Sequence, residues 1–179
     1  MLDRNFTILI VVDVQGQLAQ VMHEKQALFE NLKSIIRGIR TLEIPILWAE
    51  QIPRKLGPTI PEIAEELNGL KPIAKSSFSC WQNRAFAEAL NASGRRQVLI
   101  AGIEAHICVY QTAMDLTAAG YEVEIVADAV SSRKPENKAL ALHKLGNAGV
   151  KMTSVEMALF ELLKDAEGEA FKKILPIVK

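Results

Sequence analysis

The feature of the sequence that most constrains the fold is a run of six apolar or β-branched residues, 7–12, which ends at Asp13. Such a run is typical of a strand that helices cover on both faces, because a strand with one solvent face would alternate polar and apolar residues. Five later segments also favour strands, at 44–50, 72–75, 98–103, 122–128 and 150–153. Helical periodicity or helix-boundary residues mark 25–42, 61–68, 82–92, 107–119, the segment opened by Pro135 and the segment after Thr153. About six alternations of strand and helix predict an α/β fold, a three-layer, doubly wound parallel sheet of Rossmann-like type.

The length and charge of the chain restrict its organisation and its partners. A chain of 179 residues buries roughly 70% of its unfolded surface, which suits one core, and no repeat or linker divides it. We therefore expect one domain over 1–179. Lys and Arg number 21 and so do Asp and Glu, so neither nucleic acid nor an anionic membrane is an expected partner, and a small molecule is. The N-terminal apolar run is too short for a signal peptide and no segment has 18 consecutive apolar residues, which predicts a soluble, cytoplasmic protein.

Three reactive side chains come from distant parts of the sequence. Ligands of open parallel sheets bind beyond the carboxyl ends of the strands, and Asp13, Lys75 and Cys108 all follow predicted strand ends. Each also has a purely structural interpretation: the aspartate as a cap, the lysine as a solvated side chain and the cysteine as a small buried hydrophobe. Cys80 keeps that last interpretation, because no base or acid neighbours it, and His106 points away from a residue two positions later on a helix.

Four segments, which occur along the chain in the order expected for the family, resemble one known family. They are 102–109 with 111–113, which read GIEAHICV and QTA, then 12–15, 75–79 and 126–133. The first resembles the cysteine signature of the isochorismatase-like hydrolases, a family that includes nicotinamidases and N-carbamoylsarcosine amidases. The others extend the resemblance over almost the whole chain. The sequence is most similar to a small single-domain subgroup of this family.

The resemblance implies a catalytic triad of Asp13, Lys75 and Cys108, the residues that the strand-end argument also selects. Cys108 would be the nucleophile and Asp13 the proton carrier, while the Lys75 ammonium and the helix N-terminus would favour the thiolate. The family also implies an oxyanion hole made by the backbone N–H groups of Glu104 and Cys108, with a cis peptide bond between Ile103 and Glu104.

Departures from the family pattern restrict the substrate. Nicotinamidase-type relatives bind a metal through an aspartate and histidines after the second strand, but residues 48–57 contain neither, so we expect no metal and no cofactor. Isochorismatases of the family lack the nucleophilic cysteine, so Cys108 indicates a C–N or other acyl-like bond. Candidate substrate-binding residues are Gln15, Trp48, Gln51, Phe78 and Trp81, although aromatic residues at such places are often part of a core.

Three functions remain open from the sequence. The first is a metal-independent cysteine hydrolase that cleaves an amide-like bond through a thioester on Cys108. The second is a small-molecule binding or redox-sensing protein with a reactive thiol of low pKa. The third is a vinyl-ether hydrolase of isochorismatase type that uses Asp13 as acid. The resemblance further implies a homo-oligomer, and the apolar segment 170–178 could pack on a neighbouring subunit or on its own domain.

Overall fold

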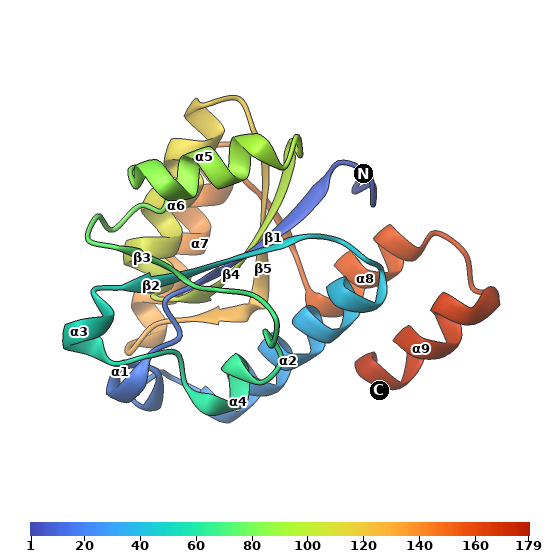
Figure 1. The fold of residues 1–179 in the computed structure, drawn as a ribbon, viewed down its shortest axis with the longest axis horizontal. Helices are drawn as coiled ribbons and strands as arrows, with labels where there is room; N and C mark the ends of the chain where they lie inside the picture. The colour runs from blue at the N-terminus through green and yellow to red at the C-terminus, as the bar shows by residue number, and fades with distance from the viewer.

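The fold is built on a six-stranded parallel sheet, which lies between two groups of helices in Figure 1. The computed structural model describes all residues from 1 to 179. The sheet has the order β3-β2-β1-β4-β5-β6, so the strand order reverses between β1 and β4. The strands are β1 (Thr7–Val12), β2 (Ile46–Gln51), β3 (Ile73–Lys75), β4 (Gln97–Ile103), β5 (Glu122–Ser131) and β6 (Lys151–Thr153). The predicted doubly wound α/β class is therefore confirmed.

Helices cover both faces of the sheet. One layer holds α2 (Lys25–Thr41), α8 (Val155–Leu163) and α9 (Gly168–Val178), and the other holds α5 (Arg84–Ala92), α6 (Tyr110–Ala118) and α7 (Pro135–Asn147). Three short helices lie in the loops beyond the strands, α1 (Gly16–Gln20), α3 (Pro53–Leu56) and α4 (Pro61–Ala64). A single π-helical turn, η1 (Ala105–Val109), leads from β4 into α6. None of the helices combines the length and the apolar character needed to cross a bilayer.

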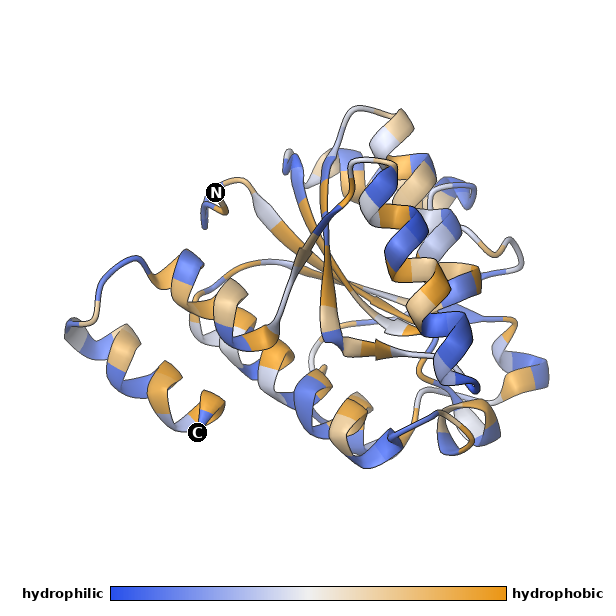
Figure 2. Cartoon of the chain, turned by 180° about the vertical axis from the view of Figure 1, so that it is seen from behind, coloured by the Kyte–Doolittle hydropathy of each residue, from blue (hydrophilic) through white to orange (hydrophobic).

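The central strand β1 explains why the sheet needs both helical layers. All six of its residues are buried, and successive side chains point to opposite faces of the sheet. Leu9 and Val11 join the core beneath α2 and α8, whereas Ile8, Ile10 and Val12 join the core beneath α5, α6 and α7. In Figure 2 the strands are correspondingly apolar, while the outer sides of the helices carry hydrophilic residues. Two apolar layers of this kind fix the register of β1 and hence the position of Asp13.

The structure differs from the sequence prediction mainly in the loops. Helix α3 lies between the predicted strand 44–50 and the predicted helix 61–68, where the sequence indicated no regular element, because Pro53 at its first position is already set for one helical turn. The following helix stops at Ala64 rather than at residue 68. Strand β5 continues to Ser131, three residues past the predicted end, because a register shift lets its last residues pair with the end of β4.

The C-terminal segment packs on its own domain. Ile174 of α9 is fully buried in the core shared with α2 and α8, and the Phe171 ring lies 6.5 Å from that of Phe160. This settles the alternative that the sequence left open for 170–178. The segment is therefore part of the chain's own hydrophobic core.

Gly102 allows β4 to approach β1 closely, and its replacement should destabilise the fold. Its φ is +115°, and a Cβ would lie 2.1 Å from the Val12 carbonyl oxygen, which is backbone and cannot rotate away. We expect Gly102→Ala to lower the free energy of unfolding by about 3 kcal/mol or more in urea titrations. Gly146→Ala is the matched control, because this helical glycine has open space around it and should gain roughly 0.5–1 kcal/mol. Equal stabilities for the two variants would contradict the explanation.

Candidate active site

Asp13 lies where the chain leaves the central strand, beside the reversal of strand order. Its amide donates to the Ala49 carbonyl at 3.2 Å, and the residue then turns with φ of 52° into a left-handed conformation, which aspartate tolerates better than most residues. Its side chain is 2% exposed. Burial raises the pKa of the carboxyl group, and the nearby Lys75 charge opposes this shift only partly.

Lys75 ends β3 and extends across the end of β2 to reach Asp13. Its Nζ donates to Asp13 Oδ2 at 2.7 Å and to Gln51 Oε1 at 2.7 Å, and it also contacts the carbonyl oxygens of Ser77 and Phe78 at 3.2 and 3.1 Å. The side chain is completely buried, so these four acceptors replace the water that an ammonium otherwise needs. The loop after β3 is therefore wrapped around a fixed positive charge.

Cys108 is the third reactive residue, and it follows β4, the strand across from β1 at the point where the strand order reverses. It lies in the turn η1 and is 7% exposed. Burial raises the pKa of its thiol, the negative charge of Asp13 raises it further, and the charge of Lys75 lowers it less. The charge of Lys75 thus favours the thiolate, as expected, but burial and the charge of Asp13 outweigh it. Burial and Asp13 together therefore raise the pKa of the Cys108 thiol.

The peptide bond before Glu104 is cis, as predicted. The Glu104 N–H makes no hydrogen bond to another group of the protein, although the residue is buried. Its carboxylate accepts from the backbone N–H of Arg133 at 3.0 Å and from Arg133 Nε at 3.1 Å. Glu104 is therefore held through its side chain while its amide stays available for a ligand.

Arg133 is a site residue to which the sequence assigned no role. It belongs to the segment 126–133 that carried the family resemblance, but no spacing rule connects it with Glu104, 29 positions earlier. The contact arises because the register shift carries β5 to the end of β4. A charged residue just after a predicted strand end was the only signal in the sequence.

His106 is turned away from the cysteine that follows it. Its Nδ1 pairs with Ser132 Oγ at 2.9 Å and its Nε2 with Asn137 Nδ2 at 3.3 Å. Both partners belong to the loop and helix that follow β5. The histidine therefore links η1 to α7, which agrees with the expectation that it is not the base for Cys108.

The predicted substrate-binding residues fall into two groups. Gln15 and Gln51 are buried at the end of β2, where Gln15 Oε1 accepts from the Gln51 N–H at 2.6 Å and its Nε2 donates to the Gly57 carbonyl at 2.7 Å. Gln51 in turn accepts from Lys75 and donates to the Ser76 carbonyl at 2.8 Å. Both glutamines thus hold Lys75 and the surrounding loops in place, and one N–H of the Gln51 side-chain amide has no protein partner.

The three predicted aromatic residues do not gather at the triad. Trp48 is part of the core beneath α2 and donates from Nε1 to Thr59 Oγ1 at 2.8 Å. Trp81 packs edge-on against Tyr121, 5.5 Å between ring centroids, next to the start of β5 and so toward the far end of the strands. Phe78 is 54% exposed, and only its backbone carbonyl contacts Lys75. Trp48 thus has the core placement that the sequence left open for aromatic residues, and Trp81 is partly buried against the other core.

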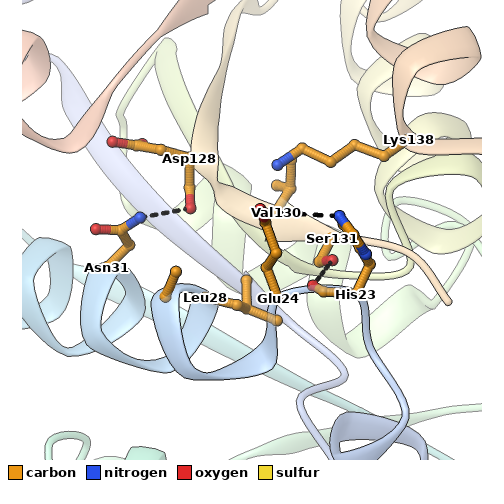
Figure 3. Close-up of a pocket in the computed structure, with 9 residues that line it drawn as sticks. His23, Glu24, Leu28, Asn31, Asp128, Val130, Ser131 and Lys138 are labelled. Carbon is orange, nitrogen blue, oxygen red and sulfur yellow. Dashed lines mark hydrogen bonds and ion pairs between the residues drawn. The ribbon is translucent and has the colours of Figure 1, made fainter. Parts of the chain in front are cut away.

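A separate polar cavity of about 130 Å³ lies between the last residues of β5 and the first turns of α2 (Figure 3). His23 lies at its wall, where its carbonyl accepts from Ser131 Oγ at 2.8 Å and its amide donates to the Ser132 carbonyl at 3.0 Å. Lys138 extends into the cavity between Glu24 and Asp128, and burial lowers the pKa of its ammonium group. None of Asp13, Lys75 and Cys108 lines this cavity.

No three side chains among the His, Cys, Asp and Glu residues are arranged so that they could hold a metal ion. The buried acidic groups near the site already have protein partners: Asp13 pairs with Lys75, Glu104 with Arg133, and Glu50 accepts from Thr59 at 2.7 and 2.9 Å. Cys80 lies close by and is fully buried, and burial raises the pKa of its thiol to about 12. The chemistry available at this site is thus that of a thiol, a carboxylate and an ammonium group.

Comparison with known proteins identifies the family. The isochorismatase domain family matches residues 7–157, which include the triad and Arg133. The chain belongs to the isochorismatase family. It is 37% identical over 168 residues to isochorismatase domain-containing protein 2 of Danio rerio, an alignment that covers 94% of this chain and 84% of the relative.

Solved structures share the isochorismatase fold along nearly the whole chain. The MAR1 ribonuclease of Caenorhabditis elegans has a TM-score of 0.92 at 30% identity and covers 99% of this chain and 91% of its own. The Escherichia coli YcaC gene product, described as an octameric hydrolase of unknown specificity, has a TM-score of 0.90 at 23% identity, with coverages of 98% and 91%. At that identity the second likeness concerns the fold alone.

Proposed function

We propose that this isochorismatase-family hydrolase cleaves the C–N bond of a small amide-like compound through a thioester on Cys108. The observation that carries the proposal is the Asp13–Lys75 ion pair of 2.7 Å, buried against the Cys108 thiol. A buried ion pair is a poor device for stability, because desolvation offsets most of the attraction between the charges. Beside a thiol it is instead a fixed base with a fixed counter-charge.

In the first half of the proposed reaction, Asp13 takes the thiol proton while the sulfur attacks the carbonyl carbon. Because the pKa of the thiol is raised, proton transfer accompanies the attack rather than preceding it. The Glu104 N–H and the Cys108 N–H would stabilise the oxyanion of the tetrahedral intermediate. Asp13 then gives its proton to the leaving nitrogen, the C–N bond breaks, and the amine departs from the thioester.

In the second half, water attacks the thioester carbon and Asp13 takes a proton from that water. The C–S bond breaks, the acid is released, and the proton returns from Asp13 to the sulfur. Lys75 keeps its charge throughout, because its role is to stabilise the ionised form of Asp13 between proton transfers. The same base thus serves both halves of the cycle without a metal in the proposed mechanism.

The raised pKa of the thiol also weighs against the redox-sensing alternative. Thiols that oxidise readily are accessible and largely ionised at neutral pH, whereas Cys108 is 7% exposed and protonated. A vinyl-ether hydrolase would need no cysteine at this place. The relative named as a ribonuclease makes RNA a further compound to test, although equal numbers of acidic and basic residues favour a small molecule.

We also propose that the chain is one domain over 1–179 that assembles into a homo-oligomer, and that it acts in the cytoplasm without a cofactor. The octameric state described for the E. coli relative supports assembly. Two large apolar side chains, Leu140 and Met157, are exposed on α7 and α8. Such side chains are compatible with subunit contacts at these helices.

The test of the function is capture of the acyl-enzyme. The protein would be mixed with p-nitrophenyl acetate and with a panel of small carboxamides, quenched in acid and analysed by intact mass and peptide mapping. The proposal expects an acyl group on Cys108 that forms and decays during turnover. Turnover with no adduct on Cys108, or cleavage of RNA by the wild type and equally by Cys108→Ala, would overturn it.

Activity should rise with pH as Asp13 loses its proton. Because burial raises the pKa of Asp13, the rise in kcat/KM should have its midpoint above 3.8, the value of an unperturbed aspartate. The thiol should cause no fall at neutral pH, since its own pKa is raised and it reacts as the protonated group. Measurement of kcat/KM from about pH 3 to about pH 9 checks both the midpoint of the rise and the absence of a fall at neutral pH. A midpoint below 3.8 would contradict the assignment of Asp13 as base.

A further inference from the structure

Only two buried polar side-chain atoms in the whole molecule lack a hydrogen-bond partner, one on a triad residue and one in the loop that wraps around Lys75. They are Asp13 Oδ1 and Ser79 Oγ. Buried polar atoms without partners are rare in folded proteins, and each one calls for a physical explanation. Asp13 Oδ2 accepts from Lys75, and the Cys108 thiol, a weak donor, lies close to the Asp13 carboxylate. Ser79 Oγ has no donor or acceptor at all.

The position of Ser79 follows from the contacts on either side of it. The carbonyl of Phe78 accepts from Lys75 Nζ at 3.1 Å, and the amide of Cys80 donates to Thr112 Oγ1 at 2.9 Å. Thr112 comes four residues after Cys108 on the continuous η1–α6 helix, hence one turn further on the same face. Ser79 is therefore located between the Lys75–Asp13 pair and the helix that carries the nucleophile.

The hydroxyl is also held rigidly, because the backbone on both sides of it is fixed. The Ser79 carbonyl accepts from Ser77 Oγ at 2.8 Å, in addition to the contacts of Phe78 and Cys80. The residue is only 2% exposed. A fixed, buried hydroxyl with no protein partner is a preorganised hydrogen-bonding group for a molecule that enters during the reaction.

We propose that Ser79 is a further catalytic residue that holds the hydrolytic water of the second half-reaction together with Asp13. Once Cys108 is acylated, its sulfur has no proton to donate to Asp13, and Asp13 Oδ1 still lacks a partner. A water molecule has two O–H groups, so it can donate one to Asp13 Oδ1 and the other to Ser79 Oγ. Its lone pair is then free for the thioester carbon. Attack forms the C–O bond, Asp13 takes the first proton, the C–S bond breaks, and Asp13 returns the proton to sulfur.

This inference rests on the proposed function and predicts a specific kinetic pattern. Acylation does not use the water, so Ser79→Ala should keep kcat/KM for p-nitrophenyl acetate within about twofold of the wild type. Deacylation should slow by about 10- to 100-fold, so kcat falls and the acetyl-enzyme accumulates on Cys108. A merely structural residue would lower both parameters together.

The experiment combines stopped-flow release of p-nitrophenol with intact mass of acid-quenched samples. Ser76→Ala is the matched control, because this serine lies in the same loop with an exposed side chain that makes no hydrogen bond, and its kinetics should match the wild type. Ser79→Thr, which keeps the hydroxyl, should retain most of the deacylation rate. The melting temperature gives a second readout: removal of an unpartnered hydroxyl should leave Ser79→Ala at least as stable as the wild type.

Two results would overturn the inference alone. One is an acetyl-enzyme that decays at the wild-type rate in Ser79→Ala, and the other is a parallel loss of kcat and kcat/KM accompanied by a lower melting temperature. A wild-type protein that never forms an adduct on Cys108 would overturn the proposed function, and this inference with it. The presence of the adduct in the wild type therefore separates the two failures.

Discussion

Cys108→Ala should lower kcat for any amide or ester that the protein hydrolyses by at least about 10⁴-fold. Without the sulfur no thioester can form, and neither Asp13 nor Lys75 supplies a second nucleophile in the same position. The variant would keep the Glu104 amide and would still bind and orient the substrate. The residual rate should therefore still exceed that of the uncatalysed reaction. Steady-state assays with p-nitrophenyl acetate and the best carboxamide of the panel provide the measurement.

Cys80→Ala is the matched control for the nucleophile. Cys80 is the only other cysteine, it is fully buried, and burial raises the pKa of its thiol as it does for Cys108. Its replacement should cost about 1 kcal/mol of stability through the lost packing and leave kcat within a few-fold of the wild type. If Cys80→Ala abolished activity while Cys108→Ala kept it, the assignment of the nucleophile would be wrong.

The fold was predictable because its signals are local. The unbroken apolar run at 7–12 indicated a strand covered on both faces, and its two sets of alternate side chains do join two different cores. The alternation of strands with helical segments then leaves few topologies for a parallel sheet. Helices α1 and α3 escaped prediction because each is a single turn set by proline or by contacts with distant loops, and such turns leave no periodicity in the sequence.

The site was predictable only in part. The strand ends placed Asp13, Lys75 and Cys108 together, and the structure brings these side chains together. The raised pKa of the Cys108 thiol was not foreseeable, because it depends on how far the fold buries the sulfur and on how closely Asp13 approaches it. Ser79 was equally hidden, since an unpartnered hydroxyl is recognised only when every other buried polar atom has been assigned a partner.

Lys75→Met should abolish activity and make the stability of the protein depend strongly on pH. The substitution leaves the Asp13 carboxylate buried without its counter-charge, which costs about 3–5 kcal/mol while the group stays ionised. Asp13 responds by keeping its proton to a higher pH, because the folded state now disfavours the charged form even more. A protonated Asp13 cannot accept the thiol proton, so kcat at neutral pH should fall by at least about 10³-fold.

The direction of the pH effect on stability follows from proton linkage. In Lys75→Met the pKa of Asp13 is higher in the folded than in the unfolded state, so the folded state binds the proton more tightly. The variant is thus most stable below the unfolded pKa of about 3.9 and loses stability as the pH rises toward the folded pKa. Urea titrations at about pH 4 and about pH 8 should show the variant closer to the wild type at the lower pH.

Two further variants separate the charge of Lys75 from its packing. Asp13→Asn/Lys75→Met removes both charges and should recover most of the stability lost at about pH 8 while remaining inactive, because it has no base. Lys138→Met removes a half-buried lysine that does not touch the triad and should keep kcat near that of the wild type. A Lys75→Met protein with wild-type kcat, or with the same stability loss at both pH values, would show that the ammonium group does not govern Asp13. The ion pair would then be a structural feature of the sheet edge, and a different base would have to serve Cys108.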